Sequence, residues 1–488
     1  MSWMIYGALA MPICAAVLTL TAATRSSVKQ INMLGGLSTS FILFGLVYSV
    51  QAGGILAAPP LYVDSLSCLL LVVIAVLNLT AFLFSASYME KELHEGPGSL
   101  GALKRYYVLL NTFAFTMISV LVVENLGLMW VCVEATTLAS ALLVAFHFNR
   151  AGIEAAWKYV MVCTVGICLA LFGTILLYYA QVSAGPGAGE ALSWLALRDI
   201  SSRLDPGMLK LAFACIIVGY GTKVGLAPMH TWLPDAHSQA PSPVSGLLSG
   251  ALLSCALYVV MRNLVIVKGA VGAEFIQPML MGLGLFSVMV AVPFLLVQHD
   301  IKRLLAYSSV EHMGMITLAL GIGTPLAVYG ALFHIFNHAV AKSALFYLAG
   351  HLSQEYRTRH ILRIRGVVAN MPFGGAAFVL FALAITGVPP FGVFASKFMI
   401  AWAAFAGGYK LAGAVLLTLL AAVFAGMVYY CFQMAFSKPA GPVHQGKLGK
   451  PAMAAVLLSA AIVITSGLYL PEPFKLVLEQ AAAVISGG

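Results

Sequence analysis

One stretch of this 488-residue sequence places three proton-active side chains in register inside an apolar run. In YGALFHIFNHAVAKSALFYLAGH, His334, His338 and Lys342 follow one another at intervals of four residues. Four residues advance a helix by about 400°, so the three side chains share one slowly drifting stripe. Two histidines can also be satisfied core residues, and a metal site needs a third ligand, for which no motif is evident. A relay that passes protons is the better interpretation, because neutral imidazoles both accept and donate protons.

A carboxylate and two more lysines lie inside other apolar runs, where ionisable groups are costly and usually functional. Glu134 lies near the middle of NLGLMWVCVEATTLASALLVAF, and we expect Lys223, in VGYGTKVGLAPMHTWLPDAH, to be its partner. The alternatives are a protonated packing carboxyl for Glu134 and a Lys223 side chain that reaches the membrane surface. Lys397 follows a break in ITGVPPFGVFASKF, which leaves its depth open. Lys158, at the start of another run, either belongs with these groups or reaches the surface.

The elements that must position these groups are membrane-spanning helices. Hydrophobic residues make up 61% of the chain and charged residues 9%, whereas soluble proteins have about 25% charged residues. So few charges cannot cover a water-facing surface, and the sequence predicts an all-α polytopic membrane protein. The net charge of +9 does not indicate nucleic-acid binding, because nearly all lysines and arginines lie in short connections between apolar runs.

The sequence gives no sign of a cofactor on this chain. The eight cysteines all fall inside apolar runs and none forms a C-x-x-C pair, which argues against an iron–sulfur site or a disulfide framework. No nucleotide, haem or metal motif is recognisable, so any electron-transfer chemistry is expected on another chain. The apolar N-terminus lacks a basic region and an A-x-A site, and we interpret it as the first span.

About fourteen apolar runs are long enough to cross a bilayer, which takes about 20 residues. They lie near residues 3–23, 31–51, 61–87, 106–123, 126–147, 158–181, 208–228, 243–267, 277–297, 304–322, 326–350, 372–404, 411–436 and 451–470. Pro228 and nearby glycines interrupt the seventh run, and VPPFG at 388–392 interrupts the twelfth. Between the sixth and seventh, EALSWLALRDISSRL predicts a short interfacial helix with Trp194 at headgroup depth.

The positions of the charges predict the topology. Sixteen of the 26 lysines and arginines lie in odd-numbered connections and seven on the opposite side, which places the odd connections in the cytoplasm and both termini outside. Paired interruptions five spans apart indicate two inverted five-helix repeats with an ion path at the midplane. The chain then divides into helices 1–3 (1–105), a first repeat of helices 4–8 (106–267), a second of helices 9–13 (268–436), and helix 14 with a tail (437–488).

Several stretches together resemble one known family. The chain is similar to the proton-translocating antiporter-like membrane subunits of respiratory complex I, Mrp-type sodium/proton antiporters and group 4 membrane-bound hydrogenases. Around Glu134 and Lys158 it is most similar to the F component of hydrogenase-4. The stretches that carry the resemblance are VDSLSCLLL, WVCVEATTLASALLVAF, EAAWKYVMV, GTKVGLAPMHTWLPDAHSQAPSPVSGLLSG, KRLLAYSSVEHMG, FHIFNHAVAKSALF and GVPPFGVFASKF.

The resemblance implies fourteen core helices and a Glu–Lys pair, here Glu134 with Lys223, whose coupling changes as protons move. It also implies a hydrophilic axis through span eight. In that span relatives often carry lysine or histidine, whereas this chain has Ser249 and Ser254, which can hold water but cannot store a proton at neutral pH. The remaining residues that the resemblance assigns to the axis are Lys158, His334, His338, Lys342 and Lys397.

These observations predict the proton-translocating subunit of a membrane-bound nickel–iron hydrogenase of the hydrogenase-4 or formate hydrogenlyase kind, or of a related complex I-like oxidoreductase. Expected partners are other membrane subunits and hydrophilic redox subunits that carry the nickel–iron centre and iron–sulfur clusters, in a prokaryotic inner membrane. Protons are the expected ions, with sodium left open. The alternatives are a complex I NADH-quinone oxidoreductase subunit, an Mrp-type antiporter subunit, and a structural membrane anchor.

Overall fold

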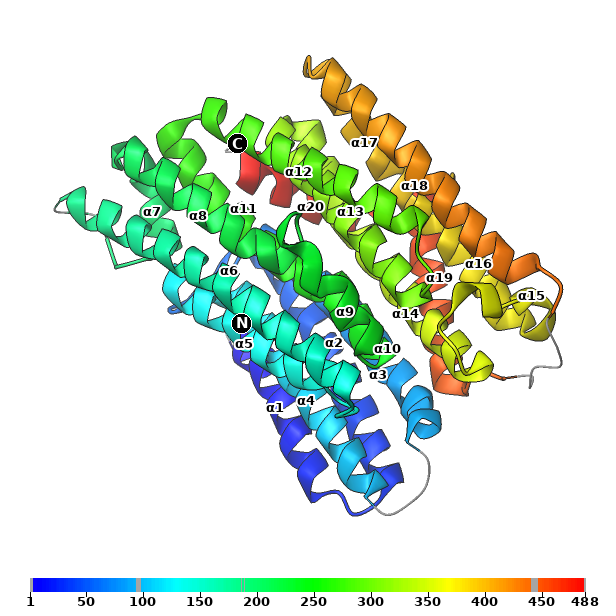
Figure 1. Cartoon of the computed structure of the whole chain (residues 1–488). Coiled ribbons are helices and arrows are strands. Elements are labelled where there is room, and N and C mark those ends of the chain that lie inside the picture. The colour runs from blue at the N-terminus through cyan, green and yellow to red at the C-terminus, as the bar shows by residue number, and fades with distance from the viewer. Residues whose placement is uncertain (1–2, 94–97, 186, 188, 440–445, 487–488) are drawn as a thin grey trace.

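The computed structural model of the chain describes residues 3–93, 98–185, 187, 189–439 and 446–486, which form one helical bundle (Figure 1). In the N-terminal half the elements are α1 Trp3–Thr21, α2 Arg25–Gly53, β1 Leu56–Ala58, β2 Leu61–Val63, α3 Ser65–Glu92, α4 Ser99–Val122, α5 Leu126–Val144, α6 Arg150–Ser183, α7 Trp194–Asp199, η1 Ser201–Arg203, α8 Pro206–Val224, η2 Met229–Thr231 and α9 Trp232–Gln239. In the C-terminal half they are α10 Ser242–Leu247, η3 Leu248–Leu252, α11 Leu253–Val271, α12 Ala273–Leu296, α13 Ile301–Ile322, α14 Pro325–Tyr356, η4 Ile361–Arg363, α15 Val367–Asn370, α16 Pro372–Thr386, α17 Gly392–Ala406, α18 Lys410–Phe436, α19 Lys450–Leu468 and α20 Glu472–Ser486.

The membrane character predicted from composition is confirmed. Within the described residues, eleven helical stretches are long and apolar enough to cross a membrane. Two of these stretches each join several elements, Pro206–Gln239 and Ser242–Val271. The more polar α13 and α14, of 22 and 32 residues, are also long enough to span a bilayer of about 30 Å.

Both predicted interruptions are present. The first helix, α8, ends at Val224, where Gly225 adopts a left-handed conformation with φ of 83°, and the chain then turns through η2 into α9. The second, α16, ends at Thr386, where Gly387 has φ of 88°, and α17 begins five residues later at Gly392. Irregular backbone of this kind is tolerated inside a membrane only where protein or a water-lined cavity satisfies it.

Three features of the fold differ from the sequence prediction. Leu56–Ala58 and Leu61–Val63 pair as a short antiparallel hairpin, so the chain is not wholly helical, and α3 begins only at Ser65. A π-helical turn, η3, joins α10 to α11 inside the predicted eighth span, and such turns are frequent at functional sites. The amphipathic helix α20 follows α19 and packs against α3 and α14.

The centre of the bundle is α14, which is buried along nearly its whole length. It packs against α13 and α17 and also contacts α3, α10, α16, α19 and α20. In Figure 1, α1 and α18 lie at opposite edges of the bundle, with α14 between them. Side chains on α14 are therefore shielded from lipid, which is the environment that the predicted histidine and lysine stripe requires.

Ion pairs at one end of the bundle join connections that are far apart in sequence. We call this end, where α3 finishes, the basic face. The end of α3 contributes Glu90, Lys91 and Glu92, which pair with Lys29, Glu355 and His147, respectively. The described chain ends lie at the opposite end of the bundle. There Ser49 donates to Met4 Sδ at 3.3 Å and Gln51 donates to Gln480 Oε1 at 3.1 Å. The described ends of the chain therefore lie on the same face of the bundle.

A buried ion pair anchors the end opposite the basic face. Arg262 lies inside α11 and is 1% exposed. Its guanidinium makes two hydrogen bonds to the Asp64 carboxylate, at 2.7 and 2.6 Å, and lies 4.3 Å from the Trp194 ring centroid. Trp194 is itself buried and donates to the Arg262 carbonyl, so its ring lies inside the protein rather than among lipid headgroups.

The charge of Arg262 acts on its neighbours at the start of α3. Burial works to raise the pKa of Asp64, but the Arg262 charge and hydrogen bonds outweigh burial and hold that pKa below its usual value. Burial, helped by the Asp64 charge, raises the pKa of Tyr62 to about 12. The carboxylate therefore stays ionised and the phenol neutral at physiological pH.

Candidate functional site

The first polar cluster lies between α5, α6 and α8, and we call it the proximal cluster: Glu134, Thr137, Tyr159 and Lys223. Lys223 is fully buried, and its Nζ donates to Thr137 Oγ1 at 2.7 Å and to Tyr159 OH at 2.8 Å. The interpretation that this lysine reaches the membrane surface is therefore wrong. The irregular segment that follows α8 ends the helix directly after Lys223 and leaves its side chain among partners from two other helices.

Glu134 and Lys223, the predicted partners, belong to one cluster but do not touch each other. The Glu134 side chain is half-buried, with Oε2 3.1 Å from Thr137 Oγ1 and Oε1 3.1 Å from Thr164 Oγ1. A hydroxyl has one proton to donate. Because the Lys223 ammonium can only donate, Thr137 Oγ1 accepts a hydrogen bond from Lys223 and donates its own hydrogen to Glu134 Oε2. Thr137 is thus the bridge between the two charges.

Removal of this bridge is expected to slow proton transfer. Thr137→Val keeps the side-chain shape but removes a hydroxyl that joins two charged groups, and a lost charge-assisted hydrogen bond of about 1.5 kcal/mol corresponds to roughly tenfold in rate. The measurement is the proton transfer rate in sealed vesicles that contain the complex. Thr136→Val is the matched control, since Thr136 is also buried but donates only to the Val133 carbonyl. Equal rates in the two variants would contradict the bridging role.

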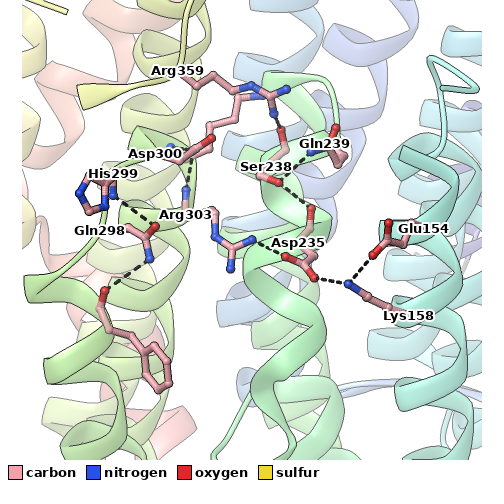
Figure 2. Close-up of polar contacts among 12 residues, drawn as sticks. Glu154, Lys158, Asp235, Ser238, Gln239, Gln298, His299, Asp300, Arg303 and Arg359 are labelled. Atoms are coloured by element: carbon pink, nitrogen blue, oxygen red, sulfur yellow. Dashed lines mark hydrogen bonds and ion pairs between the residues drawn. The ribbon is translucent and has the colours of Figure 1, made fainter. Parts of the chain in front are cut away.

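Lys158 lies away from the proximal cluster. Its side chain is 49% exposed, and Nζ is 2.7 Å from Glu154 Oε1 and 3.3 Å from Asp235 Oδ2. Asp235 also pairs with Arg303, so the lysine belongs to a network on the basic face (Figure 2). Neighbouring residues on a helix point about 100° apart. The EAAWKYVMV stretch therefore contributes Tyr159 to the buried cluster and directs Lys158 outward, and the placement of Lys158 on the buried axis is not supported by its position.

The predicted stripe on α14 is buried and contacts α13. Lys342 Nζ donates to Ser308 Oγ at 2.8 Å and to the Leu305 carbonyl at 3.2 Å. His338 is fully buried, and its ring centroid lies 4.9 Å from that of His312. Neither ring nitrogen of His338 has a hydrogen-bond partner among the described residues. A buried imidazole with both nitrogens free is suited to exchange protons with mobile water.

The second polar cluster, which we call the distal cluster, lies where α13, α14 and α17 meet: Glu311, His312, His334, Ser396 and Lys397. His334 Nε2 is 2.8 Å from His312 Nδ1, and His334 Nδ1 is 2.8 Å from Ser396 Oγ. Lys397 Nζ lies 3.3 Å from Glu311 Oε1. The break before α17 thus places Lys397 inside the bundle, beside the histidines, and resolves the depth that the sequence left open.

The two serines of the predicted eighth span differ in their contacts. Ser249 lies in the π-helical turn η3, and its Oγ is 2.8 Å from Ser309 Oγ on α13. Ser309 Oγ donates to the Leu305 carbonyl, which also accepts from Lys342 Nζ, so Ser249 extends the polar contacts of α14 towards the first half of the chain. Ser254 instead donates to the Gly250 carbonyl of its own helix at 2.7 Å.

The polar groups form two connected sets with a gap between them. Glu134, Thr137, Tyr159 and Lys223 form one set, and the contacts from Ser249 to Lys342 form the other. The distal cluster adjoins the second set through the ring contact of His338 with His312, without a hydrogen bond between the described side chains. No hydrogen bond between described residues joins the Lys223 side to Ser249, although α8 packs against α11 directly after η3. In the same described ranges, no three His, Cys, Asp or Glu side chains converge to hold a metal ion.

The part of the chain that matches known proteins includes both polar clusters. A family model described as the NADH:quinone oxidoreductase/Mrp antiporter membrane region matches residues 123–425, and another, described as the N-terminus of complex I chain 5, matches residues 50–96. The chain belongs to the NADH:quinone oxidoreductase/Mrp antiporter family. It is accordingly a membrane antiporter-like subunit of the hydrogenase and complex I group.

Relatives of this antiporter-family chain extend over most of its length. It is 39% identical over 415 residues to a hydrogenase-4 component F homolog of Methylacidiphilum infernorum (isolate V4), covering 84% of this chain and 85% of the relative. It is 32% identical over 377 residues to NADH-quinone oxidoreductase subunit N of Desulforudis audaxviator (strain MP104C), covering 75% and 70% of the two chains. A chain of the membrane-bound sulfane sulfur reductase, an archaeal respiratory membrane complex, superposes with a TM-score of 0.86 at 26% identity, covering 99% of this chain and 97% of that one.

Several residues of the antiporter site escaped the sequence analysis. Glu311 and His312 lie in KRLLAYSSVEHMG, within an apolar run, so an inventory of acidic and histidine residues in the spans, and not of lysines alone, would have found them. Thr137 and Tyr159 carry no such signal. Hydroxyl groups are common in membrane helices, and only the packing of α5 and α6 against α8 shows which of them meet Lys223.

Proposed function

We propose that this antiporter-family chain is the proton-translocating membrane subunit of a membrane-bound nickel–iron hydrogenase of the hydrogenase-4 or formate hydrogenlyase kind, or of a related complex I-like oxidoreductase. The buried series of proton-active groups from Lys223 through Lys342 to Lys397, whose side chains lie inside the bundle, carries this proposal. Buried ionisable groups in a membrane protein are costly and are retained for function. The 39% identity to a hydrogenase-4 component F homolog supports the hydrogenase host.

The topology that goes with this proposal has fourteen spans. They are α1 to α6, α8 with α9, α10 to α11, α12, α13, α14, α16 with α17, α18 and α19. Spans four to eight and nine to thirteen form two inverted repeats, each with its broken helix in the fourth position. The basic face lies in the cytoplasm of a prokaryotic cell, and both termini lie outside. Partner membrane subunits adjoin the chain, and hydrophilic subunits carry the nickel–iron centre and iron–sulfur clusters.

In this mechanism the proximal cluster controls entry to the series. Glu134 is half-buried at the surface of α5, where a charge on a neighbouring subunit can reach it. When such a charge draws Glu134 away from Thr137, the carboxylate no longer stabilises the Lys223 charge through the Thr137 hydroxyl. Lys223 then releases its proton towards Ser249 and Lys342, and His338, His312 and His334 carry it to Lys397. An interaction between neighbouring charges shifts the pKa of a group by about 1–3 units, and each unit corresponds to roughly 1.4 kcal/mol.

The proposal is tested with the native complex purified from membranes and reconstituted in sealed vesicles. Nickel–iron and iron–sulfur subunits should co-purify with the chain, and electron transfer through them should move protons across the membrane. A chain that purifies without redox partners and exchanges sodium for protons would instead be an Mrp-type antiporter. A complex that transfers electrons without moving any ion would reduce the chain to a structural anchor.

A second candidate host is complex I itself. The 32% identity to an NADH-quinone oxidoreductase subunit N favours it, and the series of buried groups would serve in the same way. The two hosts would carry different redox subunits, so the metal content of the co-purified hydrophilic subunits separates them: nickel together with iron supports the hydrogenase.

A further inference from the structure

A buried carboxylate that the mechanism above does not use lies in the distal cluster. Glu311, in the middle of α13, is 0% exposed. Its Oε1 lies 3.3 Å from Lys397 Nζ, and its Oε2 lies 3.4 Å from His312 Nε2 but makes no hydrogen bond to any described residue. Glu311 therefore faces two groups that can carry a positive charge, one on each side.

The groups around Glu311 form a chain of contacts. His312 bonds to His334, and His334 bonds to Ser396, the residue before Lys397 in α17. The other ionisable side chains of this region face the same space from α14: His338, against His312, and Lys342, one turn further along the helix. Among these described groups Glu311 is the only carboxylate, so a proton added to any of the histidines is attracted to it.

A purely structural ion pair does not account for this arrangement. A buried carboxylate that only neutralises a lysine is stable when both oxygens are hydrogen-bonded, because an unsatisfied buried oxygen costs about 1–3 kcal/mol. Glu311 instead leaves Oε2 without a hydrogen bond, 3.4 Å from His312 Nε2. In the tautomer of His312 whose Nδ1 donates to His334, protonation at Nε2 supplies the missing donor.

The proposed repeat gives Glu311 a counterpart. In that repeat α13 takes the place of α5, α16 that of α8 and α17 that of α9, because an inverted repeat keeps the order of the chain. Glu311 then corresponds to Glu134, whereas Lys223 and Lys397 lie on opposite sides of the corresponding breaks. The two carboxylates both lie near the middle of their helices, and both lysines lie beside an interruption. The first pair is held apart by Thr137, whereas the second is in contact.

We propose that Glu311 and Lys397 form a second carboxylate–lysine switch, in which a proton that arrives on His312 moves the Glu311 carboxylate from Lys397 to His312 and so releases the Lys397 proton. The inference rests on the proposed function. A proton from His334 or His338 converts the His312 imidazole to an imidazolium, which hydrogen-bonds Glu311 Oε2. Lys397, whose side chain is 11% exposed, then loses one N–H proton to water on the outer side and becomes a neutral amine. The imidazolium then returns its proton to that amine across Glu311, whose two oxygens lie beside His312 and Lys397, so one proton crosses in each cycle and the cluster is reset.

The test uses the whole complex in sealed vesicles. Glu311→Gln keeps the shape of the side chain but cannot attract the imidazolium, and we expect proton movement to fall at least about tenfold while electron transfer continues. Glu274→Gln, an exposed glutamate at the start of α12, is the matched control and should behave as wild type. If wild type moves no protons, the proposed function fails. If wild type and Glu311→Gln move protons equally well, only the switch is wrong.

Two further measurements separate a switch from charge neutralisation. The exchanged variant Glu311→Lys with Lys397→Glu restores the pair but sets a lysine against His312. We expect this variant to assemble without moving protons, and wild-type proton movement in it would overturn the proposal. Infrared difference spectra recorded on proton loading should show a carboxylate band that Glu311→Gln removes, whereas a static ion pair gives no such band. If Glu311→Gln fails to assemble, the uncharged pair Glu311→Gln with Lys397→Gln takes its place, and wild-type proton movement in that variant also overturns the switch.

Discussion

Lys223→Met is expected to abolish proton translocation while the complex still assembles and transfers electrons. The substitution removes a charge and two hydrogen bonds, to Thr137 and Tyr159, but keeps a long apolar side chain in the same buried space. Hydrogen bonds to a charged group contribute about 1.5–3 kcal/mol each, so the transfer step should slow roughly 100-fold or more. The measurement is the acidification of sealed vesicles per electron pair transferred.

The matched control for Lys223 lies on the same helix. Lys210→Met replaces an exposed lysine of α8 and should leave proton translocation unchanged. Western blotting of the purified complex shows whether both variants assemble. Wild-type proton translocation by an assembled Lys223→Met complex would exclude the proximal cluster from the path.

Arg262→Ala is expected to be the most destabilising single substitution at the end of the bundle opposite the basic face. It leaves the Asp64 carboxylate buried without its two hydrogen bonds, and removal of one partner of a buried ion pair costs about 3–5 kcal/mol. The space among Tyr62, Trp194 and Tyr258 would also be left unfilled. Thermal unfolding of the detergent-solubilised complex should begin at a clearly lower temperature.

Arg198 provides the comparison for this effect. It pairs with Asp199 at the surface of the same region, and exposed pairs contribute little, so Arg198→Ala should unfold close to wild type. The double variant Asp64→Leu with Arg262→Met removes both charges and should recover much of the lost stability. Similar unfolding temperatures for Arg262→Ala and Arg198→Ala would show that the buried pair is not an anchor.

The sequence was most informative where hydrophobicity alone determines structure. Long apolar runs predicted the membrane helices, and proline with glycine predicted the breaks after Val224 and Thr386. The hairpin at 56–63 and the helix α20 were missed, because three-residue strands and a short amphipathic helix leave only weak patterns. The π-helical turn at η3 depends on packing against α14 and has no sequence signal of its own.

The sequence predicted many of the residues that form the site, but not which of them contact one another. Lysines and histidines inside apolar runs correctly marked Lys223, His334, His338 and Lys342 as buried. Whether Glu134 touches Lys223 directly or through Thr137 depends on the rotation of α5 against α8 by a fraction of a turn. The same geometry sends Lys158 outward and Tyr159 inward, a difference of one residue that no composition argument can detect.

The central claim is that protons cross between the proximal cluster and the Ser249–Lys342 contacts. The most direct test is an experimental map of the intact complex in which ordered water molecules are visible. We expect a chain of waters that runs from Lys223 to Ser249 and on to His338. A space between Lys223 and Ser249 that is filled by apolar side chains and holds no water would contradict the account.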